Sequence, residues 1–217
     1  MDLVILVPML GRAHRVEPLL ESIDATCKAR VLFLVTPSDT AVHKAVDRAG
    51  RERLEVAKLP RGDYARKINA GYRATTEPLL FLAACDLRFH PGWYEAATAK
   101  LTRGIGVVGT NDLGSPRVIA GLHSTHSLVV REYADRYGTI DGPGEILYEG
   151  YPHEWVDDEL VGTAKHRGAW AMAVDSHVEH LHPNWHPDVP MDAMYADQRK
   201  RMRAGAPLYQ VRRRRWM

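Results

Sequence analysis

Short apolar runs alternate with helical segments along the first half of the chain. The runs of strand length cover residues 3–7, 31–35, 54–59, 79–84 and 105–109. The helices expected between them cover residues 16–23, 40–49, 63–74 and 91–101. Apolar strands separated by helices are typical of a parallel sheet covered on both faces, so the pattern predicts an α/β fold. Because ligands bind such sheets at the carboxyl ends of the strands, we expect functional loops at residues 8–12, 36–39 and 85–90.

The second half of the chain is less regular. Residues 118–122 and 127–130 are predicted to be strands around a histidine-rich turn, and residues 169–174 a further strand. The helices expected here cover residues 156–166 and 191–204. Residues 137–150, which are rich in glycine and acids, are expected to form a mobile loop. Neither a repeat nor a linker divides the chain, so we expect one domain.

The composition is that of a globular protein. A chain of 217 residues with 45% hydrophobic residues suits one α/β domain. The net charge of +2 argues against a protein that coats nucleic acid. No stretch is apolar for long enough to span a bilayer, and the acidic start of the first apolar run is unlike a secretory signal. We therefore expect a cytoplasmic protein. Cys27 and Cys85 lack a CxxC spacing and predict neither a disulfide framework nor a zinc site.

Asp86 is the sharpest candidate for chemistry in the first half. It follows the apolar run at residues 79–84. A carboxylate at the end of a buried strand is desolvated unless a cation pairs with it. A metal ion or Arg88 could supply that charge. The alternative is that Asp86 caps the following turn or helix.

An acidic run of Asp157, Asp158 and Glu159 opens the helix predicted at residues 156–166. The helix dipole favours acids in a first turn, which explains the run without a function. Three adjacent carboxylates also repel one another, which raises the pKa of at least one, and such a group can serve as a general base. Successive side chains on a helix are about 100° apart, so the three cannot all face one substrate. We expect Glu159 to pair with Lys165 or Arg167.

Histidines are concentrated late in the chain. Of the 11 histidines, those from His123 onward are His123, His126, His153, His166, His177, His180, His182 and His186. Neutral imidazole is a common ligand of transition metals, and His180 and His182 would point the same way on a strand. The distribution indicates a metal or phosphate site built by the second half. The alternative is a surface strand with scattered histidines.

Two further groups of polar side chains are candidates. Arg66, Lys67 and Asn69 lie on the helix predicted at residues 63–74 and could reach a diphosphate or a ribose. A solvated helix face explains them equally well. The basic run at residues 212–215 could bind a polyanion or be a disordered terminus.

Taken together, these motifs resemble the family-2 inverting glycosyltransferases with the GT-A fold, most closely the short versions found in actinobacteriophages. The resemblance runs from Val4 to about Tyr195. The motifs that carry it are Val7-Pro8-Met9-Leu10-Gly11-Arg12, Val35-Thr36-Pro37-Ser38-Asp39, Lys67-Ile68-Asn69-Ala70-Gly71-Tyr72, His90-Pro91-Gly92-Trp93 with the strand before it, Asp157-Asp158-Glu159-Leu160 and Glu179-His180-Leu181-His182-Pro183.

The resemblance implies a Rossmann-like, mostly parallel sheet flanked by helices, with a smaller acceptor-side region. Residues 1–110 would bind a nucleotide-sugar, residues 111–205 would hold the acceptor and catalytic groups of the same domain, and residues 206–217 would form a basic tail. The first loop, with Pro8, Gly11 and Arg12, would hold the nucleotide base. Asp39 would be the second acid that binds the base. Arg66, Lys67 and Asn69 would lie beside the donor.

The implied metal is Mn²⁺ or Mg²⁺, held by Asp86 and His182 next to the donor diphosphate. Asp157, with Asp158 as the second choice, would deprotonate an acceptor hydroxyl that attacks the anomeric carbon with inversion. The family's metal turn usually carries two or more acids, whereas here Ala84 and Cys85 precede the single acid Asp86. This departure predicts weak metal affinity, with much of the coordination supplied by the donor diphosphate.

The expected function is therefore metal-dependent transfer of a sugar from a nucleotide diphosphate sugar, with a uridine carrier favoured, to an acceptor hydroxyl. The acceptor could be a virion protein, a modified DNA base or a glycan. One alternative is a sugar nucleotidyltransferase, although the loop after the first strand is only a faint version of what that chemistry needs. The other is a non-enzymatic phage protein that binds nucleic acid, which the near-neutral charge disfavours.

Overall fold

The computed structural model describes residues 2–59 and 63–217, so Arg61 and Gly62, which precede the predicted donor helix, lie outside the described residues. Within these residues, eight strands form one sheet in the order β3-β2-β1-β4-β7-β6-β8-β5. The strands are β1 (Leu3–Pro8), β2 (Arg30–Val35), β3 (Glu52–Glu55), β4 (Leu79–Leu82), β5 (Leu87–Phe89), β6 (Val107–Asn111), β7 (Ser127–Val130) and β8 (Trp170–His180).

The sheet is mostly parallel, as the apolar runs predict. Strands β3, β2, β1 and β4 are parallel neighbours, and β8 is parallel to β6. Strand β7 is antiparallel to both β4 and β6, and β5 is antiparallel to β8. The carboxyl ends of β1, β2 and β4 therefore meet at one edge, where the predicted functional loops begin.

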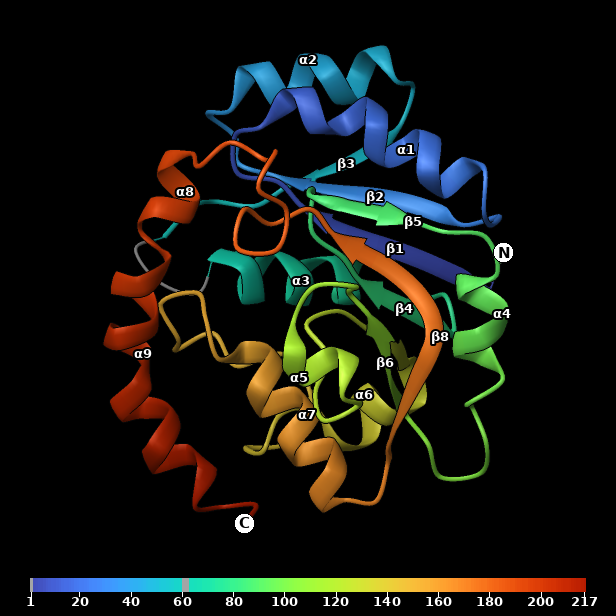
Figure 1. Cartoon of the computed structure of the whole chain (residues 1–217), viewed down its shortest axis with the longest axis vertical. Helices are drawn as coiled ribbons and strands as arrows, with labels where there is room; N and C mark the ends of the chain where they lie inside the picture. Colours follow the sequence, from blue (N-terminus) through green and yellow to red (C-terminus); the bar gives the residue numbers. More distant parts are fainter. Residues whose placement is uncertain (1, 60–62) are drawn as a thin grey trace.

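Helices cover both faces of the sheet (Figure 1). They are α1 (Val16–Asp24) with the short 3₁₀ turn Ala13–Arg15 before it, α2 (Thr40–Arg48), α3 (Asp63–Ala74), α4 (Trp93–Thr98), α5 (Pro116–Ile119), α6 (Arg131–Tyr137), α7 (Val156–His166), α8 (Ala193–Ala196) and α9 (Gln198–Arg213). No helix of the described residues is both long and apolar enough to cross a membrane.

Alternate side chains of β1 enter two separate cores. Leu3, Ile5 and Val7 pack with the apolar faces of α1, α2 and α4. Val4 and Leu6 pack with α3, α6 and α7 on the opposite face. All five side chains are buried, which explains why the strand reads as a continuous apolar run rather than an alternating one.

Several predicted elements differ in the structure. Residues 118–122 do not form a strand, because Pro116 at the start of a helix opens the short α5 instead. Strand β8 continues past the expected end at residue 174 to His180, and His182, expected to share a strand with His180, lies beyond its end. The loop at residues 137–150 is anchored to α3, because the Oδ1 atom of Asn69 accepts from the amides of Ile146 and Leu147.

The C-terminal segment is not a disordered basic tail. Helix α9 continues to Arg213, and Arg212 is only 6% exposed. Its guanidinium donates to both carboxylate oxygens of Glu159, at 2.7 and 2.6 Å. The expected pairing of Glu159 with Lys165 or Arg167 is therefore wrong, since the partner comes from a helix that lies against α7 in space.

Candidate active site

A cavity of about 320 Å³ opens at the carboxyl ends of β1 and β4. The loop after β1, the residues after β4, the acidic turn at the start of α7, the end of β8 and the first part of α9 all contribute to its wall. The residues predicted from the sequence that line it are Pro8, Arg12, Asp86, Asp157, Asp158 and His182. The fold thus joins the two halves of the predicted site around one space.

Asp86 lies at the floor of this cavity and is 4% exposed. Its Oδ2 atom accepts from Arg12 Nη1 at 2.9 Å and from the Tyr195 hydroxyl at 2.6 Å, and His180 Nε2 lies 3.6 Å from Oδ1. Burial disfavours the charged form, but His180, Tyr195 and Arg12 outweigh it and lower the pKa of Asp86. The partner is therefore Arg12 and not Arg88, which pairs with Glu179 on the surface.

Arg12 links the first loop to the segment before α9. Its backbone takes a left-handed conformation with φ of 58°, which is uncommon for a residue with a side chain. Its guanidinium donates to both oxygens of Asp192 at 2.7 and 2.9 Å and lies 4.0 Å from the centre of the Tyr195 ring. Because Asp192 also caps α8, this contact joins the first loop to the start of α8.

Three histidines surround Asp86. The rings of His126 and His180 are 5.2 Å apart, and those of His180 and His182 are 5.3 Å apart. Burial and the charge of His180 lower the pKa of His182 to about 4, so its imidazole is neutral, the form that binds metals. The Nδ1 atom of His182 accepts from the Asn184 amide at 3.1 Å. The Nε2 atom of His126 is buried and has no hydrogen-bond partner among the described residues.

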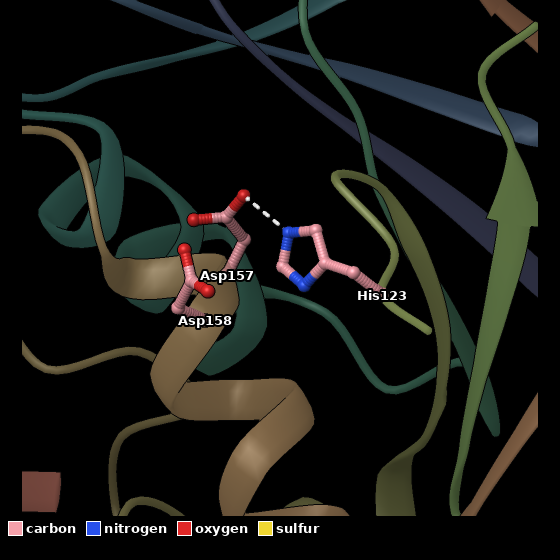
Figure 2. A group of neighbouring side chains, drawn as sticks. All are labelled: His123, Asp157 and Asp158. Carbon is pink, nitrogen blue, oxygen red and sulfur yellow. Dashed lines mark hydrogen bonds and ion pairs between the residues drawn. The ribbon is translucent and has the colours of Figure 1, made fainter. Parts of the chain in front are cut away.

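The acidic turn lies next to His123 (Figure 2), and all three residues line the cavity. Oδ2 of Asp157 lies 3.2 Å from His123 Nε2, and Oδ1 of Asp158 accepts from Arg117 at 2.8 Å. Burial alone would raise the pKa of Asp157, but His123 and backbone amides outweigh it and the pKa is lowered. Burial and the charge of Asp157 raise the pKa of Asp158. Adjacent carboxylates thus differ in acidity, which leaves Asp157 ionised.

His123, Asp157 and Asp158 are also spaced so that they could hold a cation. One ligand atom from each residue lies within 4.8 Å of the others. Two protein partners already neutralise this group, because Asp157 pairs with His123 and Asp158 with Arg117. A metal here would have to displace both pairs.

Several predicted donor residues lie behind the cavity rather than on its wall. Lys67 is fully buried, and its ammonium group donates to Met9 O at 2.5 Å and to Thr36 and Asp63 at 3.0 Å. Asn69 is also fully buried and donates to Leu147 O at 2.8 Å. Their contacts fix the first loop and the loop at residues 137–150.

The other predicted donor residues outside the cavity wall have structural partners too. Oδ2 of Asp39 accepts from the Gly11 amide at 2.7 Å, and its Oδ1 caps α2. Arg66 donates to Glu149 at 3.1 Å. Asp39 and Gly11 therefore shape the loop that carries Arg12, whereas direct contact of any of these residues with a donor stays a prediction.

Other cavity residues were given no individual role from the sequence. They include His123, His126, Glu154, Trp155, Tyr195 and Arg201. The late concentration of histidines was a signal for His123 and His126, whereas the remaining four carry no local signal. Burial and the charge of Asp157 raise the pKa of Glu154 to about 7, although Arg201 opposes the shift. Glu154 therefore adds a further acid–base group to the cavity wall.

No protein-family model and no curated protein sequence matches this chain. Solved structures do match it. The mannosyltransferase PcManGT from Pyrobaculum calidifontis, in complex with GDP-Man and Mn²⁺, has a TM-score of 0.66 and 16% identity over 98% of this chain. This chain spans 62% of that protein's length.

Glucosyl-3-phosphoglycerate synthase from Mycobacterium tuberculosis, in complex with Mn²⁺, UDP-Glc and phosphoglyceric acid, also matches. It has a TM-score of 0.64 and 14% identity over 98% of this chain and 79% of its own. Identities this low describe the fold alone, because one fold hosts many activities. The chain has the GT-A fold of these glycosyltransferases.

Proposed function

We propose that this chain is a metal-dependent glycosyltransferase that moves a sugar from a nucleotide diphosphate sugar, with a uridine carrier favoured, to an acceptor hydroxyl with inversion. The observation that supports it best is one cavity that holds both Asp86 and the pair formed by Asp157 and His123. The GT-A fold supports the same function by analogy, since its solved neighbours carry nucleotide-sugars and Mn²⁺.

The residues around Asp86 fit a divalent cation. Asp86 is ionised and desolvated, and the neutral imidazole of His182 is a second possible metal ligand on the same wall. A cation at Asp86 would compete with Arg12 and Tyr195, which bond to its Oδ2 atom. One carboxylate and one imidazole suit Mn²⁺ better than Mg²⁺, which prefers oxygen ligands. Ligation through Nε2 of His182 would require the ring to give up the bond from the Asn184 amide. When bound, the metal would neutralise the charge of the leaving diphosphate.

Asp157 and Asp86 would act on opposite sides of the transferred sugar. Asp157 takes the proton from the acceptor hydroxyl as that oxygen forms a bond to the anomeric carbon. The bond from the anomeric carbon to the diphosphate breaks, and its electron pair leaves with the nucleoside diphosphate. Arg12 lies beside Asp86 and can add positive charge on the leaving-group side. Direct displacement leaves no covalent enzyme intermediate.

The acceptor is proposed only as a hydroxyl of a virion protein, a modified DNA base or a glycan. Arg117, Asp158 and Trp185 line the same cavity as Asp157, and Trp185 is 38% exposed. A half-exposed indole next to charged groups is a surface on which a sugar ring can stack.

The proposal is tested by incubating the chain with UDP- and GDP-linked sugars, with Mn²⁺ or with a chelator, and measuring nucleoside diphosphate release. Release should require the metal and should increase with an acceptor. The anomeric configuration of the product, read by NMR, should be opposite to that of the donor. Retention would overturn the role of Asp157. Formation of a nucleotide-sugar from a sugar phosphate and a nucleoside triphosphate would instead support a nucleotidyltransferase.

A further inference from the structure

We propose that the C-terminal helix α9 fixes the position of Asp157 through Trp155, which makes Trp155 a positioning residue for the reaction. The inference rests on the proposed function, in which Asp157 is the base. It assigns a catalytic consequence to a helix that the sequence presents only as a polar segment with a basic end.

The backbone at Trp155 is in an unfavourable conformation. Its φ of 79° and ψ of −7° lie in the left-handed region, immediately before the first residue of α7. A bulky side chain rarely occupies this region, so surrounding contacts must hold it there. Asp157 follows two residues later, and a relaxed backbone at Trp155 would change the direction in which α7 begins. The carboxylate of Asp157 would then move relative to His123.

The contacts that hold Trp155 come from α9. Its indole Nε1 donates to Met202 O at 2.9 Å. Its ring stacks on Tyr209, with centroids 4.6 Å apart and planes inclined by 24°. Gly205 lies beneath the same ring, because a Cβ atom there would lie 2.6 Å from the indole Cδ1. A glycine inside a helix is unfavourable, and the closeness of the indole gives this one a reason.

Two ion pairs flank this contact. Arg201 of α9 lies 3.4 Å from Glu154, one residue before Trp155. Arg212, near the other end of α9, holds Glu159, two residues after Asp157. The turn that carries Asp157 and Asp158 is thus attached to α9 on both sides, and Arg201 and Met202 extend the attachment to the cavity wall.

The test uses two changes on α9 that leave the acidic turn itself intact. Gly205→Ala pushes a methyl group into the indole, and Tyr209→Leu removes the stacked ring while keeping an apolar side chain. Val211→Ala is the matched control, because Val211 lies on the same helix and is 64% exposed. Each variant is assayed for kcat at saturating donor, for the Kd of the nucleoside diphosphate with Mn²⁺, and for Tm.

We expect both changes to lower kcat by about tenfold or more, since misplacing a catalytic group by 1 Å can cost on the order of 100-fold. The Kd should stay within about twofold, because Asp86 is bonded to Arg12 and Tyr195, which lie outside α9, and His182 meets α9 at its first residue, Gln198, far from Gly205. Val211→Ala should match the wild type. Trp155→Ala removes the indole ring that meets Gly205. In that background, Gly205→Ala should lower kcat by a smaller factor than it does in the wild type. Such non-additivity is expected of residues in contact.

A second readout follows Asp157 without catalysis. The groups that face His123 are Asp157, Asp158 and Arg117. Proton NMR of the His123 ring, identified by its loss in His123→Gln, should report a lower pKa for His123 in Gly205→Ala than in the wild type, because Asp157 has moved away. Unchanged kcat and unchanged His123 titration in folded Gly205→Ala and Tyr209→Leu would overturn the inference. Absence of transfer by the wild type would instead overturn the proposed function.

Discussion

The Nε2 atom of His123 lies 3.2 Å from Oδ2 of Asp157 on the wall of a cavity that Asp86 also lines. The two residues come from different elements, His123 from the loop before β7 and Asp157 from the first turn of α7. Burial lowers the pKa of His123, but the bond and charge of Asp157 outweigh it, and the net shift is upward. The pair therefore keeps Asp157 ionised in a partly buried site, which a general base requires.

Asp157→Asn should lower the transfer rate by about 10²–10⁴-fold, because it keeps the shape of the side chain but removes its basicity. The Kd of the nucleoside diphosphate with Mn²⁺ should change little, since Asp157 acts on the acceptor. Asp158→Asn is the matched control. It should lower the transfer rate less, because the Asp158 carboxylate is bonded to Arg117. Equal transfer by Asp157→Asn and the wild type would assign the base elsewhere.

His123→Gln should shift the acid limb of the kcat profile to higher pH. In the folded enzyme the pKa of Asp157 is lowered, so the base is lost only as pH falls below the usual carboxyl range. Without the positive partner, burial and the charge of Asp158 raise that pKa, and activity disappears at a higher pH. The profile of kcat against pH measures the shift, and coincident profiles would contradict the pairing.

Asp86→Asn should abolish the increase in Tm that Mn²⁺ and a nucleoside diphosphate produce together. A ligand that binds only the folded state raises its stability, and Asp86 is the proposed ligand of the metal. Asp157→Asn should retain the increase. This comparison shows which of two groups binds the metal. One is the proposed site at Asp86 and His182, and the other is the group of His123, Asp157 and Asp158, which is also spaced to hold a cation. Loss of the shift only in Asp157→Asn would move the metal to the acidic turn.

Arg212→Ala should destabilise the fold by about 3–5 kcal/mol, because it leaves the buried carboxylate of Glu159 without its cation. Both side chains are under 10% exposed, and Tyr151 is the other side chain bonded to this carboxylate. Urea unfolding measures the change, with the exposed Arg214→Ala as the control. Deleting residues 212–217 should therefore impair folding as well as binding of a polyanion. Unchanged stability in both variants would contradict a structural role for Arg212 and would favour the disordered terminus considered from the sequence.

Local patterns determined the elements that carry the site. The apolar runs predicted β1, β2 and β4, and the acidic start and apolar spacing predicted α7 at its observed bounds. Asp86 was found because an acid that ends a buried strand is conspicuous in the sequence. These features depend on residues close together in the chain, whose periodicity is the same before and after folding.

Only the tertiary structure decided which charges meet. Arg12 and Asp86 are 74 residues apart, Glu159 and Arg212 are 53 apart, and His123 and Asp157 are 34 apart. No local spacing distinguishes Arg12 from Arg88 as the partner of Asp86, or Arg212 from Lys165 as the partner of Glu159. The sheet order and the path of α9 make the choice, because burial leaves each carboxylate only the cations that the packing brings to it. The same packing holds Trp155 in its left-handed conformation, which its own preferences would not predict.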